Sequence, residues 1–163
     1  MPYRVAVITL SDSGASGKRA DASGPLIGEM LSPEEFTVTS CHLLPDDPEA
    51  LSALLRDLCD AGKADLILTT GGTGLSPRDH TPEATLAVIE RNVPGISEVM
   101  RAASMKITPR AMLSRGVSGI RGRTLIINLP GSPKAVRENL EVILPTLPHA
   151  LAILTDWEHN CAR

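Results

Sequence analysis

The sequence has few aromatic residues and no long hydrophobic segment. Tyr3, Phe36 and Trp157 are its three aromatic residues among 163. A flat heterocyclic ligand would therefore be held by backbone contacts and aliphatic walls more than by stacking on aromatic rings. The apolar run at residues 5–10 follows Arg4 and is too short for a signal peptide or a membrane span. These absences predict a cytoplasmic protein that does not bind a membrane.

Several familiar site patterns are also missing. The three cysteines lie far apart and form no disulfide or zinc spacing, which suits a reducing compartment: Cys41, Cys59 and Cys161. The chain has no Gly-x-x-x-x-Gly-Lys-Ser/Thr P-loop, no Gly-x-Gly-x-x-Gly dinucleotide fingerprint and no nucleophile elbow. Its four histidines have no metal-ligand spacing. These observations argue against P-loop NTPases, dinucleotide-binding enzymes and zinc enzymes.

The charge is nearly balanced overall but unevenly distributed. A net charge of −3 argues against a general nucleic-acid binder. Residues 101–137 nevertheless contain eight of the sixteen Lys and Arg residues and no Asp or Glu: Arg101, Lys106, Arg110, Arg115, Arg121, Arg123, Lys134 and Arg137. Such a stretch could hold a small polyanion, although its members also suit solvated surface positions. The length and the average hydrophobic content indicate one domain over residues 1–163.

Strand and helix patterns alternate along the chain. Strands are predicted at Tyr3–Leu10, Phe36–Leu44, residues 65–70 and Thr124–Leu129. Helices are predicted at residues 25–31, 48–61, 82–91, 95–106 and 134–154, with Pro145 and Pro148 bending or splitting the last one. Residues 108–122, which contain a proline and two glycines before Gly122, predict loops with short strands. This alternation predicts an α/β fold in which helices cover both faces of an open, mostly parallel sheet.

The most informative segment is residues 69–85, Thr-Thr-Gly-Gly-Thr-Gly-Leu-Ser-Pro-Arg-Asp-His-Thr-Pro-Glu-Ala-Thr, which begins within a predicted buried strand. Glycines let backbone N–H groups approach a ligand closely, and a strand, a glycine-rich loop and a helix start form the layout of an anion site. Thr81, Pro82 and Glu83 are typical of a helix start, with Thr81 as the N-cap. The segment therefore predicts a phosphate-bearing ligand at the carboxyl end of a strand.

Four predicted strands end in polar loops, at Ser11, Asp46, Thr70 and Pro130. Ligands of open α/β sheets bind at the carboxyl ends of the strands, so we expect these loops to share one site. Asp12, Asp46 and Asp79 would repel a phosphate there unless Mg²⁺ lies between them. That combination indicates phosphoryl or nucleotidyl transfer. The alternative is that the aspartates are caps and turn residues, an interpretation that fits Asp12 best and Asp79 least.

Several blocks of the chain, in order, resemble one known family. They are Ser11-Asp12 with Gly17, Asp21 and Gly24, then Leu44-Pro45-Asp46, the glycine segment, Ile107-Thr108-Pro109 with the block from Ala111 to Arg115, and the block from Leu125 to Val136. This arrangement resembles the molybdopterin adenylyltransferases, the family of the bacterial Mog and MoaB proteins, the plant Cnx G domain and the gephyrin G domain. The resemblance covers nearly the whole chain.

The resemblance implies Mg²⁺-dependent transfer of AMP from ATP to the terminal phosphate of molybdopterin, giving adenylylated molybdopterin and pyrophosphate. It implies catalytic roles for Asp46 and Asp79, and we assign Asp79 to Mg²⁺ and phosphate positioning. Substrate-binding positions are expected at Ser11, Asp12, Thr70, Gly71, Gly72, Thr73, Gly74, Arg78, Ser114, Pro130, Gly131 and Ser132. Position 132 varies within the family, so no catalytic role is assigned to Ser132.

The resemblance also implies a homotrimer, to which the apolar helix face of Ile96, Val99, Met100 and Ala103 could contribute if it is not plain core. The chain ends at Arg163 without the second domain that is fused in some relatives. Molybdate insertion is therefore expected to fall to a separate partner protein.

Two other hypotheses stay open at this point. A binding or scaffold protein would keep the pterin pocket with little or no transferase activity, but the presence of both Asp46 and Asp79, with Arg78 beside Asp79, favours the enzyme. A sugar-phosphate or nucleotide-binding domain of unrelated descent would rest on the glycine loop alone.

Overall fold

The computed structural model describes residues 1–155, so Trp157, His159 and Cys161 lie outside the described residues. The middle layer of this part is a six-stranded sheet in the order β2-β1-β3-β6-β5-β4. Its strands are β1 (Tyr3–Leu10), β2 (Phe36–Leu44), β3 (Leu66–Thr70), β4 (Arg91–Asn92), β5 (Ser118–Arg121) and β6 (Thr124–Leu129). The pairs β1–β2, β1–β3 and β3–β6 are parallel, and β5 runs antiparallel to both of its neighbours. The predicted open, mostly parallel sheet is confirmed.

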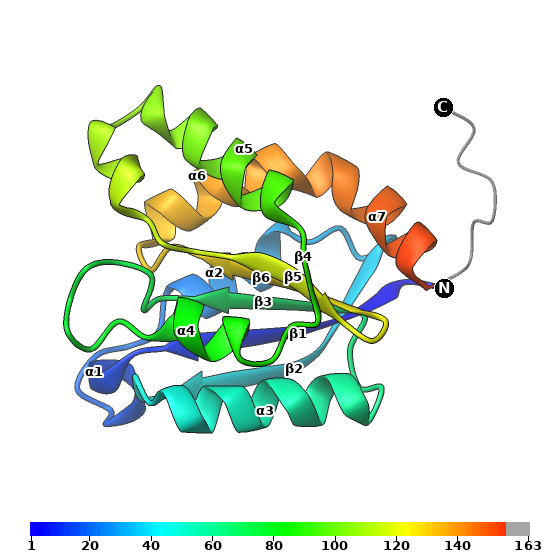
Figure 1. Cartoon of the computed structure of the whole chain (residues 1–163), viewed down its shortest axis with the longest axis horizontal. Coiled ribbons are helices and arrows are strands. Elements are labelled where there is room, and N and C mark those ends of the chain that lie inside the picture. The colour runs from blue at the N-terminus through cyan, green and yellow to red at the C-terminus, as the bar shows by residue number, and fades with distance from the viewer. Residues whose placement is uncertain (156–163) are drawn as a thin grey trace.

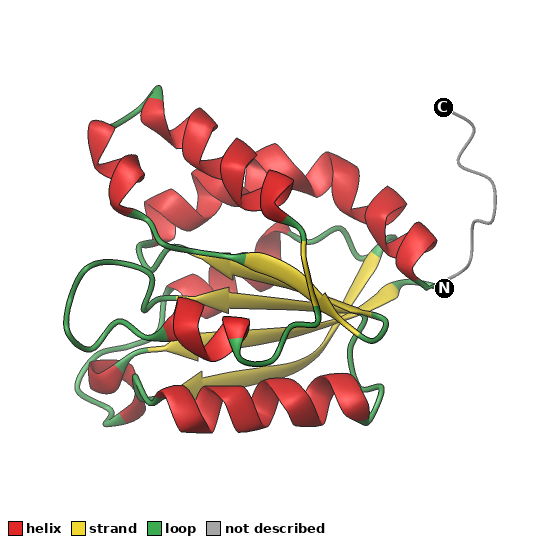
Figure 2. Cartoon of the chain, in the orientation of Figure 1, coloured by secondary structure: helices red, strands yellow, loops and turns green. Residues whose placement is uncertain are grey.

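Helices lie on both faces of the sheet (Figure 1 and Figure 2). One face is covered by α2 (Ser23–Met30), α5 (Pro94–Met105), α6 (Pro133–Ile143) and α7 (Leu147–Leu154). The other is covered by α3 (Pro48–Asp60) and α4 (Thr81–Leu86). The short elements are α1 (Asp12–Ala15) and the 3₁₀ turns η1 (Pro109–Leu113) and η2 (Leu144–Thr146). None of the helices in residues 1–155 has the length and apolar character needed to cross a membrane.

Burial on both faces of the sheet explains why the sequence of β1 is apolar at consecutive positions. Val5 and Val7 pack in the hydrophobic cluster beneath α2 and α6, whereas Ala6 and Ile8 pack in the cluster beneath α3. All four side chains are buried because successive residues of a strand point to opposite faces. A central strand covered on both faces therefore needs apolar residues at every position.

The segment after the glycine loop differs from its prediction. The helix predicted at residues 82–91 ends at Leu86, and Arg91–Asn92 forms β4, which pairs with β5. Thr81 is not the N-cap but the first residue of α4, and its hydroxyl donates to the carbonyl of Gly71 at 2.9 Å. The helix prediction was too long because it could not include the pairing of β4 with a strand that follows about 27 residues later.

Other boundaries follow the proline and cap signals. The last predicted helix is split at Pro145, where η2 separates α6 from α7, as predicted. The first polar loop contains α1, whose N-cap Ser11 accepts a hydrogen bond from the Gly14 N–H through its side chain. The broken region after α5 forms η1 and β5, in agreement with loops and short strands.

Chain topology places the loops that follow β1 and β3 side by side. From β1 the chain moves to one side to form β2 and later returns on the other side to form β3. In open α/β sheets, such a reversal of direction opens a crevice at the carboxyl ends of the strands. The loops after β1, β2, β3 and β6 all lie at this edge, on the left in Figure 1.

Candidate active site

A pocket of about 570 Å³ opens at this edge of the sheet. Its lining includes Ser11, Asp46, Thr70 and Gly131, which come from the ends of β1, β2, β3 and β6. The structure thus brings together the four loops, as expected from the alternation of elements. Asp12, Gly71, Gly72, Asp79 and Ser132 line the same pocket.

The glycine loop follows β3 and lies between the ends of β1 and β6. Gly71 has a φ of 96°, and an added Cβ would overlap the carbonyl oxygen of Leu10. Gly72 has a φ of 69°, and its Cβ would overlap the Thr81 hydroxyl. Only glycine suits both the positive φ and the close approach. Thr70 anchors the loop by donating to the carbonyl of Pro130 at 2.6 Å.

The carbonyl groups of the loop are all engaged by the protein. Those of Gly71 and Gly72 accept hydrogen bonds from the hydroxyl and the N–H of Thr81, at 2.9 and 3.1 Å. Those of Thr73 and Gly74 accept from the N–H and the Nε of Arg115, at 2.8 and 2.7 Å. Because each carbonyl is held by Thr81 or Arg115, the oxygen atoms that would repel a phosphate are occupied.

The N–H of Gly71 is also occupied, since it donates to the carbonyl of Leu129 at 3.3 Å. Gly71 therefore allows the loop to turn with a positive φ and joins it to β6 through its N–H. Of the four glycine-loop residues expected from the sequence to bind substrate, Gly71 thus has its N–H engaged within the protein.

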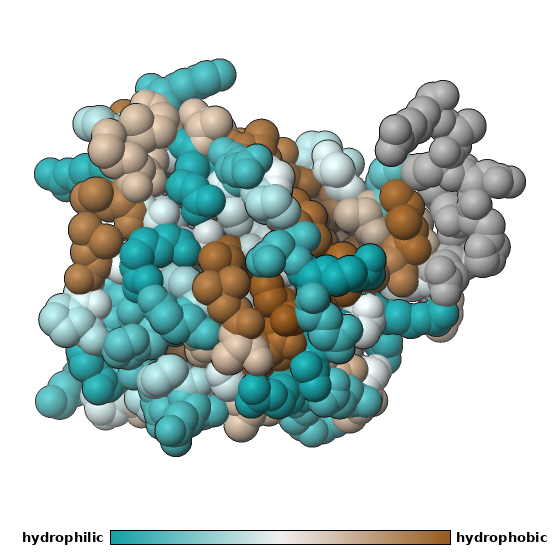
Figure 3. Space-filling view, viewed as in Figure 1, coloured by the Kyte–Doolittle hydropathy of each residue, from teal (hydrophilic) through white to brown (hydrophobic). Residues whose placement is uncertain are grey.

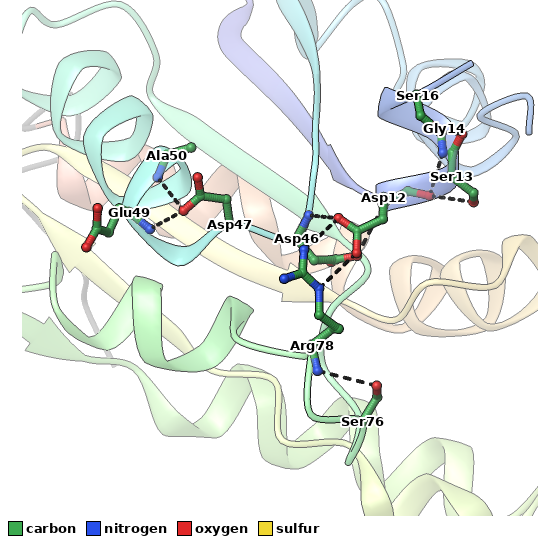
Figure 4. A network of polar contacts seen from close by, with 11 residues as sticks. Asp12, Ser13, Gly14, Ser16, Asp46, Asp47, Glu49, Ala50, Ser76 and Arg78 are labelled. Carbon is green, nitrogen blue, oxygen red and sulfur yellow. Dashed lines mark hydrogen bonds and ion pairs between the residues drawn. The ribbon is translucent and has the colours of Figure 1, made fainter. Parts of the chain in front are cut away.

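Asp12 and Asp46 are joined by two hydrogen bonds, each from the backbone N–H of one residue to the carboxylate of the other. The N–H of Asp46 donates to Asp12 Oδ1 at 2.9 Å, and the N–H of Asp12 donates to Asp46 Oδ2 at 3.2 Å. Arg78 reaches across from the glycine loop and contacts both oxygens of Asp12, at 2.9 and 3.0 Å (Figure 4). The loops after β1, β2 and β3 are thus joined by one polar network.

The electrostatic states of these two carboxyl groups differ. Hydrogen bonds from the Arg78 guanidinium and the Asp46 N–H hold the pKa of Asp12 below its usual value. Partial burial raises the pKa of Asp46, and the nearby charges of Asp12 and Asp79 add to this rise. Asp46 is therefore a carboxylate that a bound cation would stabilise.

Asp79 is half-buried at the end of the glycine loop, and its carboxylate accepts a hydrogen bond from the Ser76 N–H at 3.0 Å. No cluster of three or more His, Cys, Asp or Glu side chains within residues 1–155 is arranged to hold a metal ion. Mg²⁺ bound together with a nucleotide needs only one or two protein carboxylates, because phosphate oxygens and water complete its shell. Asp46 and Asp79 fit that requirement, since both line the pocket and the charge of Asp79 acts on Asp46.

The loop between α1 and α2 supplies Asp21, which belongs to the first block of the resemblance but received no role, and Ser23, which the resemblance did not include. Asp21 lines the pocket, accepts a hydrogen bond from the Thr9 hydroxyl at 2.8 Å and accepts another from the Gly24 N–H at 3.1 Å. Ser23 donates to the carbonyl of Gly131 at 2.7 Å. The spacing of Asp21 three residues before Gly24 is a capping signal that could have identified the hydrogen bond between these two residues.

A second cavity of about 200 Å³ lies between α5, η1 and α6. Ser114 and Pro130, both expected in one site with the glycine loop, line this cavity instead of the first. It is also lined by polar residues that are not among the predicted substrate-binding positions: Arg101, Thr108, Arg110, Asn128 and Asn139. Because Pro130 and Gly131 are neighbours, a single turn after β6 borders both cavities.

The remaining expected residues lie around the first pocket without lining it. Thr73 and Gly74 belong to the glycine loop behind it, and Arg78 reaches it through Asp12. The acid-free basic stretch does not form one surface. Arg115 lies beside the glycine loop, but Arg121 pairs with Asp60 at the opposite edge of the sheet, because β5 runs antiparallel to β6.

A family model described as a probable molybdopterin binding domain matches residues 6–149. The chain belongs to this family. Its relatives include the molybdopterin adenylyltransferase of Helicobacter pylori strain J99, 41% identical over 152 residues that cover 92% of this chain and 86% of that protein. The molybdopterin adenylyltransferase of Escherichia coli K12 is 42% identical over 140 residues, which cover 85% and 72% of the two chains.

Solved structures agree with this membership of the molybdopterin binding domain family. The molybdopterin biosynthesis enzyme MoaB from Thermus thermophilus is 52% identical and superimposes with a TM-score of 0.89, covering 94% of this chain and 97% of that chain. The resemblance inferred from the motifs and the α/β fold that it implies are both confirmed.

Proposed function

We propose that this protein is a molybdopterin adenylyltransferase of molybdenum cofactor biosynthesis, which transfers AMP from ATP to the terminal phosphate of molybdopterin. The observation that carries this proposal is the pair of cavities on either side of the Pro130–Gly131 turn, with part of the glycine loop and the carboxylates of Asp46 and Asp79 in the larger one. Two adjacent cavities suit a reaction that must align two substrates. The names of relatives that are 41% and 42% identical support the same activity.

In the proposed reaction, an oxygen of the terminal phosphate of molybdopterin forms a bond to the α-phosphorus of ATP. The bond from that phosphorus to the oxygen shared with the β-phosphate breaks, and pyrophosphate leaves with the electron pair. The second pKa of a phosphate monoester is near 6, so the nucleophile is largely ionised at neutral pH and needs no strong base. The protein has to align two polyanions and stabilise the charge on the leaving group.

Residues in and beside the first pocket suit these tasks. Gly72, Thr73 and Gly74 offer backbone N–H groups on a loop whose carbonyls are held by Thr81 and Arg115. Asp46 and Asp79 would hold Mg²⁺, which supplies neutralisation of phosphate charge when it is bound. The Thr70 hydroxyl donates to the carbonyl of Pro130 and so joins the ends of β3 and β6 beside this pocket.

The proposal also covers the oligomeric state of the protein, its location and its partner protein. We expect a homotrimer that acts in the cytoplasm and passes its product to a separate molybdate-insertion protein. Of the helix face considered for the trimer, Met100 is buried in the core, while Val99 is 46% exposed. Exposed apolar residues continue from Val99 along the end of α5 and through η1: Met105, Ile107, Met112 and Leu113. Figure 3 shows that hydrophobic surface on this face of the molecule is distributed among hydrophilic regions.

The test uses the purified protein with molybdopterin, ATP and Mg²⁺, and follows adenylylated molybdopterin by mass spectrometry and pyrophosphate by a coupled assay. We expect both products in equal amounts, and their loss when the divalent cation is removed by chelation. Binding of molybdopterin without release of pyrophosphate would instead establish the scaffold hypothesis.

A further inference from the structure

Arg115 makes more polar contacts with the glycine loop than any catalytic candidate does. Its Nε donates to the carbonyl of Gly74 at 2.7 Å and its Nη2 donates to the carbonyl of Asp79 at 2.8 Å. Its own N–H donates to the carbonyl of Thr73 at 2.8 Å. The remaining terminal nitrogen, Nη1, pairs with the carboxylate of Glu83 in the first turn of α4. One side chain therefore joins both ends of the segment from residue 74 to residue 79.

The guanidinium is suited to this position by its shape as well as its charge. It presents donors in a fixed plane, so it can hold two carbonyls and a carboxylate at once, whereas a lysine ammonium is a single point on a flexible stem. The Glu83 pKa is lowered, chiefly by its hydrogen bond from Arg115, which keeps the carboxylate ionised as the counter-ion. The Arg115 side chain is about one-third exposed, at 35%.

The position of Arg115 in the chain links the loop to the second cavity. Its neighbour Ser114 lines that cavity, and so does Gly116, whose carbonyl accepts a hydrogen bond from Arg101 at 2.8 Å. Asp79, whose carbonyl Arg115 holds, lines the first pocket. A displacement of Arg115 would therefore change the position of Asp79 relative to the cavity that contains Ser114.

We propose that Arg115 is a positioning residue, which fixes the carboxylate of Asp79 relative to the second cavity by holding the carbonyls of Gly74 and Asp79. This inference rests on the proposed adenylyl transfer for its effect on turnover. It does not require Arg115 to touch either substrate. A displacement of about 1 Å at a reacting centre can cost on the order of 100-fold in rate, so the loss of this support should appear in kcat.

Arg121 provides a matched control at the opposite edge of the sheet. Its guanidinium likewise makes three hydrogen bonds, two to the carboxylate of Asp60 at 2.8 and 2.9 Å and one to the carbonyl of Val88 at 3.0 Å. Arg121→Gln therefore removes a similar number of contacts without touching the glycine loop. Glu83→Gln is a second control, because it removes the counter-ion and leaves the carbonyl contacts of Arg115 in place.

The experiment compares Arg115→Gln, Arg115→Lys and both controls in steady-state kinetics, thermal unfolding and amide hydrogen exchange. We expect Arg115→Gln to lower kcat by roughly 30- to 100-fold with changes in KM below about threefold. Arg115→Lys should recover little of this loss, and both control variants should keep kcat within about threefold. Exchange in a peptide that spans residues 73–79 should accelerate in Arg115→Gln and stay unchanged in Arg121→Gln.

A double variant separates positioning from a general structural role. If Arg115 acts through Asp79, adding Arg115→Gln to Asp79→Asn should lower kcat by less than about threefold. A full multiplicative loss in that background, rescue by lysine, or unchanged exchange at residues 73–79 would overturn the proposal. Failure of the wild-type protein to form product would instead overturn the proposed function, while the exchange measurement would still report whether Arg115 holds the loop.

Discussion

Arg78 and Asp12 form a bidentate ion pair that joins the loop after β3 to the loop after β1, with nitrogen–oxygen distances of 2.9 and 3.0 Å. The carboxylate of Asp12 accepts a further hydrogen bond from the N–H of Asp46. The guanidinium of Arg78 is therefore already paired. A phosphate that is to bind Arg78 must compete with Asp12 for it.

The first prediction concerns this pair. Arg78→Met should raise the pKa of Asp12 toward its usual value, because the pair is the largest cause of its lowered pKa. A lowered pKa in the folded protein stabilises the fold above the pKa of the unfolded chain, and this contribution disappears as the pH falls through the folded value. The melting temperature of the variant should therefore differ most from wild type near neutral pH, by less than roughly 2 °C because the pair is exposed. Carbon-detected NMR titration measures the pKa, and an unchanged value would contradict the assignment.

The second prediction separates catalysis from stability at Asp79. Asp79→Asn should lower kcat by roughly 100- to 1000-fold, because it removes the negative charge that would hold the metal and phosphates. Its melting temperature should change little, since an amide oxygen can still accept the hydrogen bond from Ser76. Asp47→Asn is the control, because asparagine also caps helices well and Asp47 is the N-cap of α3. Parallel losses of stability and activity in Asp79→Asn would make Asp79 a structural residue.

Local patterns were sufficient to predict most of the fold. The buried strand β1 and the break at Pro145 both follow from the properties of neighbouring residues. β4 was missed because its two residues become a strand only through pairing with β5. Thr81 was misassigned because its hydroxyl bonds to Gly71, a partner that the local N-cap rule does not include.

The sequence was sufficient to predict that the strand-end loops meet, but not the second cavity or the contacts of Arg115. Strand ends at Ser11 and Thr70 could be grouped because the carboxyl ends of parallel strands share an edge. The separate cavity at Ser114 depends on the packing of α5, η1 and α6, which no motif describes. Arg115 was visible in the sequence as one basic residue among eight, but its contacts with the glycine loop depend on how distant segments meet.

The third prediction follows from the raised pKa of Asp46. A carboxyl group with a raised pKa in the folded protein favours folding when it is protonated, and this contribution is lost as the pH rises through the folded value. Asp46→Asn should therefore raise the melting temperature at pH 7, on the order of 1–3 °C, and the difference should vanish below about pH 4. Thermal unfolding from pH 3.5 to pH 8 measures it. A variant less stable than wild type at pH 7 would mean that the ionised carboxylate supports the fold.

The fourth prediction tests the shape of the glycine loop. Gly71→Ala should lower the free energy of unfolding by roughly 2–4 kcal/mol, because alanine disfavours positive φ and its Cβ would overlap the Leu10 carbonyl. Gly28→Ala in α2 is the control, since an added Cβ there has no neighbour within 4 Å, and it should stabilise the helix by about 0.5–1 kcal/mol. Chemical denaturation gives both values. Similar stabilities of the two variants would show that the loop can relax away from β1. The contact between the loop and the end of that strand would then not determine where the N–H groups proposed to bind phosphate lie.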